Sequence, residues 1–205
     1  MADIDPRLIS ALTAQLVSRQ RLLNAGAVSI GWKLGMGKRE RIGTGPVIGY
    51  LTSATCLKSG TEYHSGGVAT LHADAELALE LGADTQIVGY GPALELVDLD
   101  GGEKPGQIVA ANVFHRAVVF GPMRPALTAL EGRLLIDGHV RAAAPLASGH
   151  ARLVDHVSKL LAMVGERLVA GDRLITGSIV QLPVRPGDRV AADLETLGSA
   201  EAVIT

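Results

Sequence analysis

The first strong pattern in the chain is a stripe of apolar residues at helical spacing near its start. The stripe is formed by Leu8, Leu12, Leu16 and Leu23, with Ile9 beside them. Asp5-Pro6 supplies an N-cap followed by a proline in the first turn, and Asn24-Ala25-Gly26 supplies an end. The pattern therefore predicts an amphipathic helix over residues 6–24.

A second helical stripe and a series of short strands occupy the last third of the chain. The stripe is formed by Leu153, Val157, Leu160, Leu161 and Val164. It predicts a helix over about residues 153–168, with Gly165 near its end. Beyond it, short apolar runs are separated by turn sequences such as Pro186-Gly187-Asp188. The strands predicted there cover residues 173–175, 179–184, 189–194 and 200–204.

The middle of the chain has a different texture. Residues 27–36 form a short apolar run, and residues 37–67 are rich in Gly, Ser and Thr. Three segments that mix acidic and apolar residues follow, at 71–81, 87–100 and 127–140. One helix, a strand-rich body and one further helix predict an α+β domain with a dominant sheet.

Composition narrows the classes of protein that this chain can belong to. Its 205 residues suit one domain, and 47% apolar with 20% charged residues is ordinary for a folded chain. A formal net charge of −2 and a pI near 6.3 argue against a nucleic-acid-binding surface. No apolar run reaches the roughly 18 residues of a membrane span, and the N-terminus shows no secretory signal. Cys56 is the one cysteine, and a cytoplasmic location is expected. From its charge and its short apolar runs, the chain is expected to bind neither nucleic acid nor membrane.

Two charged residues lie where apolar strands are predicted. Lys33 is the only charge in the ten residues 27–36, so it either extends to solvent along its apolar stem or serves a pocket. Glu95 lies among apolar residues in 91–98. It either faces water or needs a partner, which could be Lys, Arg or a metal, because an isolated buried charge is very costly.

The acids at 73–81 have two interpretations. Ala, Leu and Glu are strong helix formers, so local propensity favours a helix with its acids in solvent. In a strand, by contrast, Asp74, Glu76 and Glu80 would share one face and the leucines the other. Two carboxylates two residues apart on one face could hold a hard cation through oxygen. In a helix Asp74 and Glu76 would point apart.

Six ordered segments, over about residues 28–204, resemble the fumarylacetoacetate hydrolase superfamily. The similarity is to its branch of 2-oxopent-4-enoate hydratases and 4-oxalocrotonate decarboxylases. The segments are Ile30-Gly31-Trp32-Lys33-Leu34-Gly35, Asp74-Ala75-Glu76-Leu77-Ala78, Pro92-Ala93-Leu94-Glu95-Leu96-Val97, Asn112 before the strand 117–121, Ile175-Thr176-Gly177-Ser178, and Pro186-Gly187-Asp188-Arg189-Val190 with Leu197-Gly198-Ser199. No single segment is specific, but their common order is.

This resemblance implies a fold and a site. The fold would be β-rich α+β, like the C-terminal domain of fumarylacetoacetate hydrolase, with a mixed, rolled β-sheet and flanking helices. Residues 73–81 would be a strand, and residues 27–205 one catalytic domain after an N-terminal helical appendage, 1–26. The implied ligands of a bound Mg²⁺ or Mn²⁺ are Asp74, Glu76 and Glu95, and the implied catalytic residues are Lys33, Asn112 and Ser178. Oxygen donors suit such a cation, and three protein ligands leave positions for substrate.

The chain departs from the pattern of this branch in three ways. Asp74 stands where the hydratases usually have Glu, and the spacing from Glu76 to Glu95 is only 19 positions. Only 32 residues precede Lys33, so the larger N-terminal region of typical hydratases is mostly missing. The hydrolases of the superfamily carry a His and Glu pair ahead of the metal strands, and the nearest segment here, Glu62-Tyr63-His64, has the wrong order. This argues against hydrolytic C–C cleavage.

The expected function is that of a lyase, a hydratase or a decarboxylase, acting on a 2-oxo acid or its enol through a metal-stabilised enolate. The alternatives are a catalytically degenerate structural partner of a larger hydratase or decarboxylase, and a C–C hydrolase or tautomerase of the same superfamily. We also expect a homo-oligomer, and a complex with a related hydratase or decarboxylase as a further partner.

Overall fold

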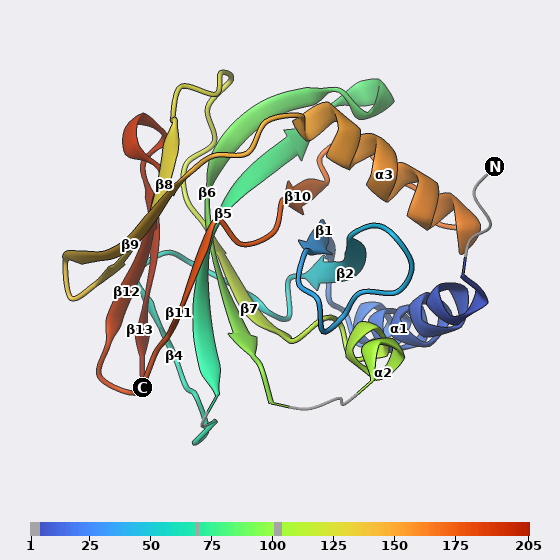
Figure 1. Cartoon of the computed structure of the whole chain (residues 1–205), viewed down its shortest axis with the longest axis horizontal. Coiled ribbons are helices and arrows are strands. Elements are labelled where there is room, and N and C mark those ends of the chain that lie inside the picture. Colours follow the sequence, from blue (N-terminus) through green and yellow to red (C-terminus); the bar gives the residue numbers. More distant parts are fainter. Residues whose placement is uncertain (1–4, 69, 101–103) are drawn as a thin grey trace.

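The computed structural model describes residues 5–68, 70–100 and 104–205. The α-helices are α1 (Pro6–Asn24), α2 (Pro105–Ala110) and α3 (His150–Met163). The strands are β1 (Ser29–Gly35), β2 (Val47–Thr52), β3 (Cys56–Leu57), β4 (Thr61–Tyr63), β5 (Leu71–Leu81), β6 (Ile87–Asp98), β7 (His115–Phe120), β8 (Glu131–Ile136), β9 (His139–Pro145), β10 (Arg173–Ile175), β11 (Val180–Pro183), β12 (Arg189–Asp193) and β13 (Ser199–Ile204). Long curved strands separate the helices from a smaller sheet (Figure 1). The predicted strand-rich α+β class is confirmed.

The strands form two sheets that pack against each other. The larger has the order β2-β1-β10-β5-β6-β7-β3, with β11 also paired to β5, and the smaller has the order β4-β13-β12-β8-β9. Both are mixed, because β1 and β10, β3 and β7, and β4 and β13 run parallel while the other pairs are antiparallel. One hydrophobic cluster joins the sheets, with Leu71 and Leu94 from the larger and Val190 and Ala200 from the smaller.

Strands β5 and β6 form a hairpin that carries the acidic segments. A short 3₁₀ turn, Ala83–Thr85, connects them, and their register runs from the pair Leu71 and Asp98 to the pair Leu81 and Ile87. This tight connection accounts for the short spacing between the second and third acids of the predicted site.

The helix that local propensity favours over residues 73–81 does not form. Strand β5 is hydrogen-bonded on both edges, to β6 on one side and to β10 and β11 on the other. Its odd positions, such as Ala75 and Leu77, lie in hydrophobic clusters, and most of its even positions are buried as well. Ladder hydrogen bonds and burial on both faces therefore outweigh the helical preference of Ala, Leu and Glu.

Helix α1 has its predicted bounds and packs onto the sheet. The Asp5 carboxylate accepts a hydrogen bond from a backbone N–H of the first turn at 3.0 Å, as expected of an N-cap. Leu8 and Leu12 lie in the same hydrophobic cluster as side chains of β1 and β5. The division into an appendage, 1–26, and a catalytic domain, 27–205, stays a prediction, and residues 1–4 lie outside the described part of the chain.

The other two helices differ from the sequence-based expectation. Helix α3 begins and ends earlier than the predicted range 153–168. It ends early because Gly165 has φ +77°, a left-handed conformation, and the N–H of Glu166 returns to the carbonyl of Leu161 at 2.9 Å. Helix α2 was not predicted, because its six residues are too few for a periodic stripe. Among the described helices, none combines the length and apolar character that a bilayer crossing requires.

Candidate metal centre

Three carboxylates meet on one face of the β5–β6 hairpin. Asp74 and Glu76 are two residues apart on β5, and Glu95 on β6 is the register partner of Asp74. One oxygen atom from each carboxylate lies within 4.8 Å of the others. All three side chains are buried. The face-sharing that a strand predicts for Asp74 and Glu76 is therefore present, and Glu95 joins them through strand pairing.

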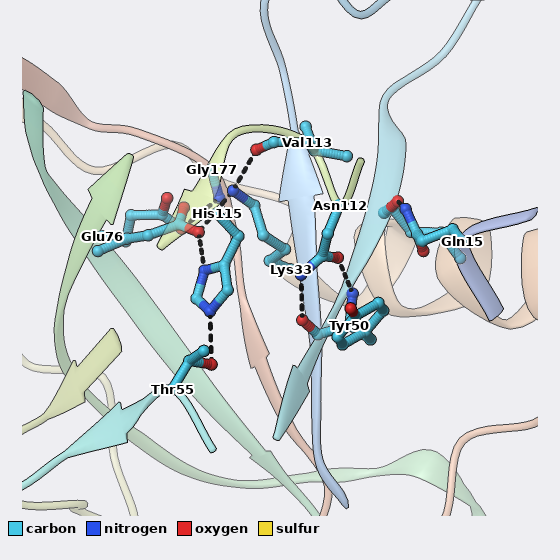
Figure 2. A network of polar contacts seen from close by, with 11 residues as sticks. Gln15, Lys33, Tyr50, Thr55, Glu76, Asn112, Val113, His115 and Gly177 are labelled. Carbon is cyan, nitrogen blue, oxygen red and sulfur yellow. Dashed lines mark hydrogen bonds and ion pairs between the residues drawn. The ribbon is translucent and has the colours of Figure 1, made fainter. Parts of the chain in front are cut away.

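Lys33 and Glu95 form a buried ion pair. The Lys33 Nζ lies 2.5 Å from Glu95 Oε1 and donates a hydrogen bond to the carbonyl of Val113 at 2.9 Å. Lys33 is 3% exposed and Glu95 is 1% exposed, so the solvent-facing alternatives for both residues are wrong. An ammonium group has three N–H donors, and these two contacts leave one for another acceptor in the site. Figure 2 shows the Lys33 side chain reaching towards Val113.

His115, at the start of β7, contacts the same oxygen of the Glu95 carboxylate as Lys33. Its Nδ1 lies 2.6 Å from Glu95 Oε1, and its Nε2 lies 2.9 Å from Thr55 Oγ1, as Figure 2 shows for the contact with Thr55. Because a carboxylate accepts, we assign the imidazole proton to Nδ1, and the Thr55 hydroxyl then donates to Nε2. Burial lowers the pKa of His115 despite the neighbouring Glu95 charge, which favours this neutral form.

The three acids differ in how readily they ionise. Burial and the charge of Glu95 raise the pKa of Asp74 from 3.8 to about 7. Burial, with the charges of Glu95 and Asp74, raises the pKa of Glu76 well above its usual range. Burial also acts to raise the pKa of Glu95, but the Lys33 charge and the His115 hydrogen bond outweigh it and hold that pKa below its usual value. Glu95 is thus the most readily ionised acid of the cluster.

The donors of this cluster fit a divalent cation. The Oδ1 atom of Asp74 is buried and has no hydrogen-bond partner among the described residues, which is costly unless another group binds it. Glu76 Oε2 accepts a hydrogen bond from the N–H of Gly177 at 2.8 Å, which fixes that carboxylate. Three buried carboxylates are the oxygen ligands that Mg²⁺ and Mn²⁺ prefer, and a cation would take the place of the protons that the cluster otherwise binds.

A cavity of about 370 Å³ opens over the three acids. Ser178, which directly follows Gly177, lines it and is exposed. Lys33 lines it as well, so Lys33 and Ser178, of the three predicted catalytic residues, share the cavity with the acids. Its rim includes Lys38 and Arg39 from the loop between β1 and β2.

Asn112 lies beside Lys33 but outside the lining of this cavity. Its Oδ1 accepts a hydrogen bond from the N–H of Tyr50 at 2.7 Å, and its Nδ2 donates to the carbonyl of Tyr50 at 3.0 Å (Figure 2). A Cβ atom at Gly49 would come within 2.8 Å of both Asn112 and Lys33. Asn112 therefore ties β2 to the segment before β7, and its catalytic role stays a prediction.

Comparison with known proteins was made at the level of sequence and of structure. No family model matches the sequence, and no curated protein sequence is significantly similar to it. The 4-oxalocrotonate decarboxylase from Pseudomonas putida G7, solved with magnesium and adipate, superposes with a TM-score of 0.86 at 22% identity, over 97% of this chain and 86% of that chain. A protein assigned to the fumarylacetoacetate hydrolase family from Yersinia pestis CO92 gives 0.66 at 20% identity, over 87% and 93%. The chain has the fumarylacetoacetate hydrolase fold.

The fumarylacetoacetate hydrolase fold confirms the predicted architecture, and with it the family resemblance at the level of the fold. A 2-hydroxyhepta-2,4-diene-1,7-dioate isomerase from Mycobacterium marinum shares it, with a TM-score of 0.68 at 19% identity over 87% of this chain and 76% of that chain. Decarboxylase and isomerase thus use one architecture, so the reaction must be argued from the residues of the site.

Two residues of this site escaped the sequence analysis. His115 could have been suspected only from its place just before a predicted strand, because its contact with Glu95 depends on a register shift between β6 and β7. Glu40 also lines the cavity and is buried, although it lies in a Gly-rich segment without readable periodicity. No spacing rule connects either residue with the three acids.

Proposed function

We propose that this chain is a divalent-metal-dependent enzyme that acts on a 2-oxo acid or its enol. We propose a lyase reaction, either hydration or decarboxylation. The observation that carries the proposal is the cluster of three buried carboxylates at a cavity. One of them has a buried oxygen to which no residue in the described part of the chain is hydrogen-bonded. Solved structures with the same fold include enzymes named as a decarboxylase and as an isomerase, which supports an enzyme.

In this proposal Asp74, Glu76 and Glu95 hold Mg²⁺ or Mn²⁺. The bound cation would supply Lewis-acid stabilisation of the negative charge that develops on the 2-oxygen of the substrate. Lys33 uses its third N–H donor to bind the substrate carboxylate, because its other two donors are engaged by Glu95 and Val113. The hydroxyl of Ser178 can orient a substrate oxygen or a water at the open side of the cavity.

The ion pair of Lys33 with Glu95 supports a substrate-binding role for Lys33 over a role in proton shuttling. Loss of its proton would leave the buried Glu95 carboxylate without its cationic partner. An ammonium group held next to the acids instead offers a positive charge to an anionic substrate. The shape of the cavity beyond the acids would then decide between water addition and loss of CO₂.

Calorimetric titration of the metal-stripped protein with Mn²⁺, alone and with oxalate, tests this function. Oxalate mimics the enolate of a 2-oxo acid, so we expect Mn²⁺ to bind and oxalate to tighten that binding. A double variant, Asp74→Asn with Glu76→Gln, should lose both effects and shows whether Mn²⁺ binds at these acids. Turnover of 2-oxo-alkenoates, followed by loss of the conjugated absorbance and by CO₂ release, then separates hydration from decarboxylation.

Failure of Mn²⁺ and oxalate to bind the wild-type protein would contradict the proposal and favour a degenerate structural partner. The homo-oligomer, the complex with a related hydratase or decarboxylase, and the cytoplasmic location stay predictions. Size measurement in solution, and co-purification with a larger relative, would test the first two.

A further inference from the structure

The loop between β1 and β2, residues 36–46, contributes a fourth carboxylate to the cavity. Glu40 is 6% exposed, whereas its neighbours Arg39 and Arg41 are exposed. Glu40 lines the same cavity as Asp74 and Glu76 but does not belong to the cluster of possible metal ligands. Burying a carboxylate is costly, so a glutamate that turns inward from an exposed, basic loop is a candidate functional residue.

We propose that Glu40 is the catalytic residue that moves a proton to and from C3 of the substrate. This inference rests on the proposed function, because it requires a bound 2-oxo acid in the cavity. It adds a residue that the sequence pattern did not single out, and it separates the group that transfers the proton from the groups that hold the metal.

The structure fixes the Glu40 carboxylate in the cavity. The N–H of Gly37 donates to Glu40 Oε1 at 2.5 Å, and a Cβ atom at Gly37 would come within 2.8 Å of that oxygen, so a larger residue there would displace the carboxylate. The adjacent Arg39 holds the loop, because its Nη1 donates to the carbonyl of Leu99 at 2.8 Å and its guanidinium lies 5.0 Å from the Phe114 ring centroid.

The other carboxylates of the cavity, and Lys33, have roles or partners of their own. The three clustered acids are the metal donors, and Lys33 is held between a carboxylate and a carbonyl. Among the described lining residues, Glu40 is the remaining carboxylate. Burial is the largest cause of the raised pKa of Asp74, and the charge of Glu40 adds to it, which is consistent with the two carboxylates lying within electrostatic range of each other.

The step is balanced without a further reactant. The Glu40 carboxylate accepts the proton from C3, the electrons of that C–H bond form the C2–C3 double bond, and the electrons of the carbonyl π bond move to the 2-oxygen. The products are the enolate of the substrate and a neutral Glu40 carboxylic acid. The reverse step returns the proton to C3. In D₂O the acid exchanges with solvent between the two steps, so deuterium enters at C3.

Proton NMR of 2-oxobutanoate with the Mg²⁺-loaded protein in D₂O measures this exchange. We expect Glu40→Gln to slow it by about 10²–10⁴-fold. Glutamine keeps an oxygen that can accept from Gly37, so the loop should stay in place. The affinities for Mn²⁺ and for oxalate, measured by calorimetry, should therefore be unchanged. Glu62→Gln, at an exposed glutamate, is the matched control and should exchange like the wild type.

The outcomes separate this inference from the proposed function. Wild-type exchange in Glu40→Gln, or a loss of Mn²⁺ affinity in it, would overturn the assignment of Glu40 while leaving the metal site standing. Binding without any exchange in the wild type would also overturn it. Partial recovery in Glu40→Asp, which restores a carboxylate, would support it. A wild-type protein that binds neither Mn²⁺ nor oxalate would refute the proposed function itself.

Discussion

The raised pKa of Asp74 predicts how the stability of the metal-free protein depends on pH. The folded protein keeps this proton up to about pH 7, whereas the unfolded chain loses it near the ordinary value of 3.8. Between these values the folded state binds more protons than the unfolded state, so the free energy of unfolding falls as the pH rises. Above about pH 7 the fall ends, because both states are then ionised. Asp74→Asn removes the titrating group and with it this loss.

The magnitude follows from the same two values. A pKa displaced from 3.8 to about 7 corresponds to ~4 kcal/mol of unfolding free energy. Because the Asp74 side chain is buried, water does not screen most of this cost. Glu76, with its raised pKa, contributes in the same direction. The lowered pKa values of Glu95 and His115 act in the opposite direction and make the free energy of unfolding rise with pH. They do so at pH values below 4.5 for Glu95 and below 6.5 for His115, the ordinary pKa values of these groups. The comparison of wild type with Asp74→Asn at each pH reports the titration of Asp74 together with its effect on Glu76, whose pKa the Asp74 charge helps to raise.

Thermal unfolding in a chelator, at steps between about pH 5 and pH 8, measures this difference. The titration of Asp74 between about pH 5 and pH 7 should cost the wild type ~3 kcal/mol of unfolding free energy. The Tm of Asp74→Asn, relative to that of the wild type, should therefore rise by about 6–12 °C across this range. Saturating Mg²⁺ should abolish the fall in the wild type, because the cation replaces the proton. A difference in Tm that stays constant with pH would refute the reasoning, since Asp74 would then titrate normally in the folded protein.

Three further variants test individual contacts of the site. Glu76→Gln should weaken Mn²⁺ binding by about 10–100-fold in a calorimetric titration. The control is Glu80→Gln, on the same face of β5 but outside the cluster, which should bind Mn²⁺ like the wild type. Unchanged affinity in Glu76→Gln would contradict the assignment of Glu76 as a ligand. Lys33→Met leaves a buried carboxylate without its cation, so denaturant unfolding should show a loss of about 3–5 kcal/mol, and wild-type stability would contradict the ion pair. Asn112→Ala removes two hydrogen bonds to the backbone of Tyr50 and should cost about 1–3 kcal/mol in the same assay. Weakened oxalate binding in that variant would favour the predicted catalytic role of Asn112.

The fold was predictable where the sequence carries periodicity or an ordered series of family-like segments. Helix α1 and the strands after residue 172 follow from stripes and turn residues. Strand β5 does not, because its composition of Ala, Leu and Glu favours a helix and the pairing that overrides this preference comes from segments distant in sequence. Only the resemblance placed Asp74 and Glu76 on a strand. The end of α3 was missed because a glycine in a left-handed conformation stops a helix that its apolar stripe would continue.

The site was predictable as a set of acids and a lysine, but not as a network. The pattern marked Lys33 and Glu95 as charges among apolar residues, and it left their partners open. Their pairing depends on which strands are neighbours, and the contact of His115 with Glu95 depends on a register shift that no spacing reveals. Glu40 escaped notice because a charged residue in a polar loop is ordinarily in solvent.

The contacts of Lys33 explain how a buried site can carry three carboxylates. The ammonium group neutralises Glu95, and neutral His115 adds a hydrogen bond without adding charge. Two acids, Asp74 and Glu76, then remain to balance the two positive charges of a divalent cation, so Lys33, the three clustered acids and the bound metal are together formally neutral, with Glu40 outside this set. Without the cation the same two acids regain neutrality by binding protons, as their raised pKa values indicate. Cation and proton therefore compete for one pair of carboxylates, and Lys33 keeps the third ionised for the metal in either state.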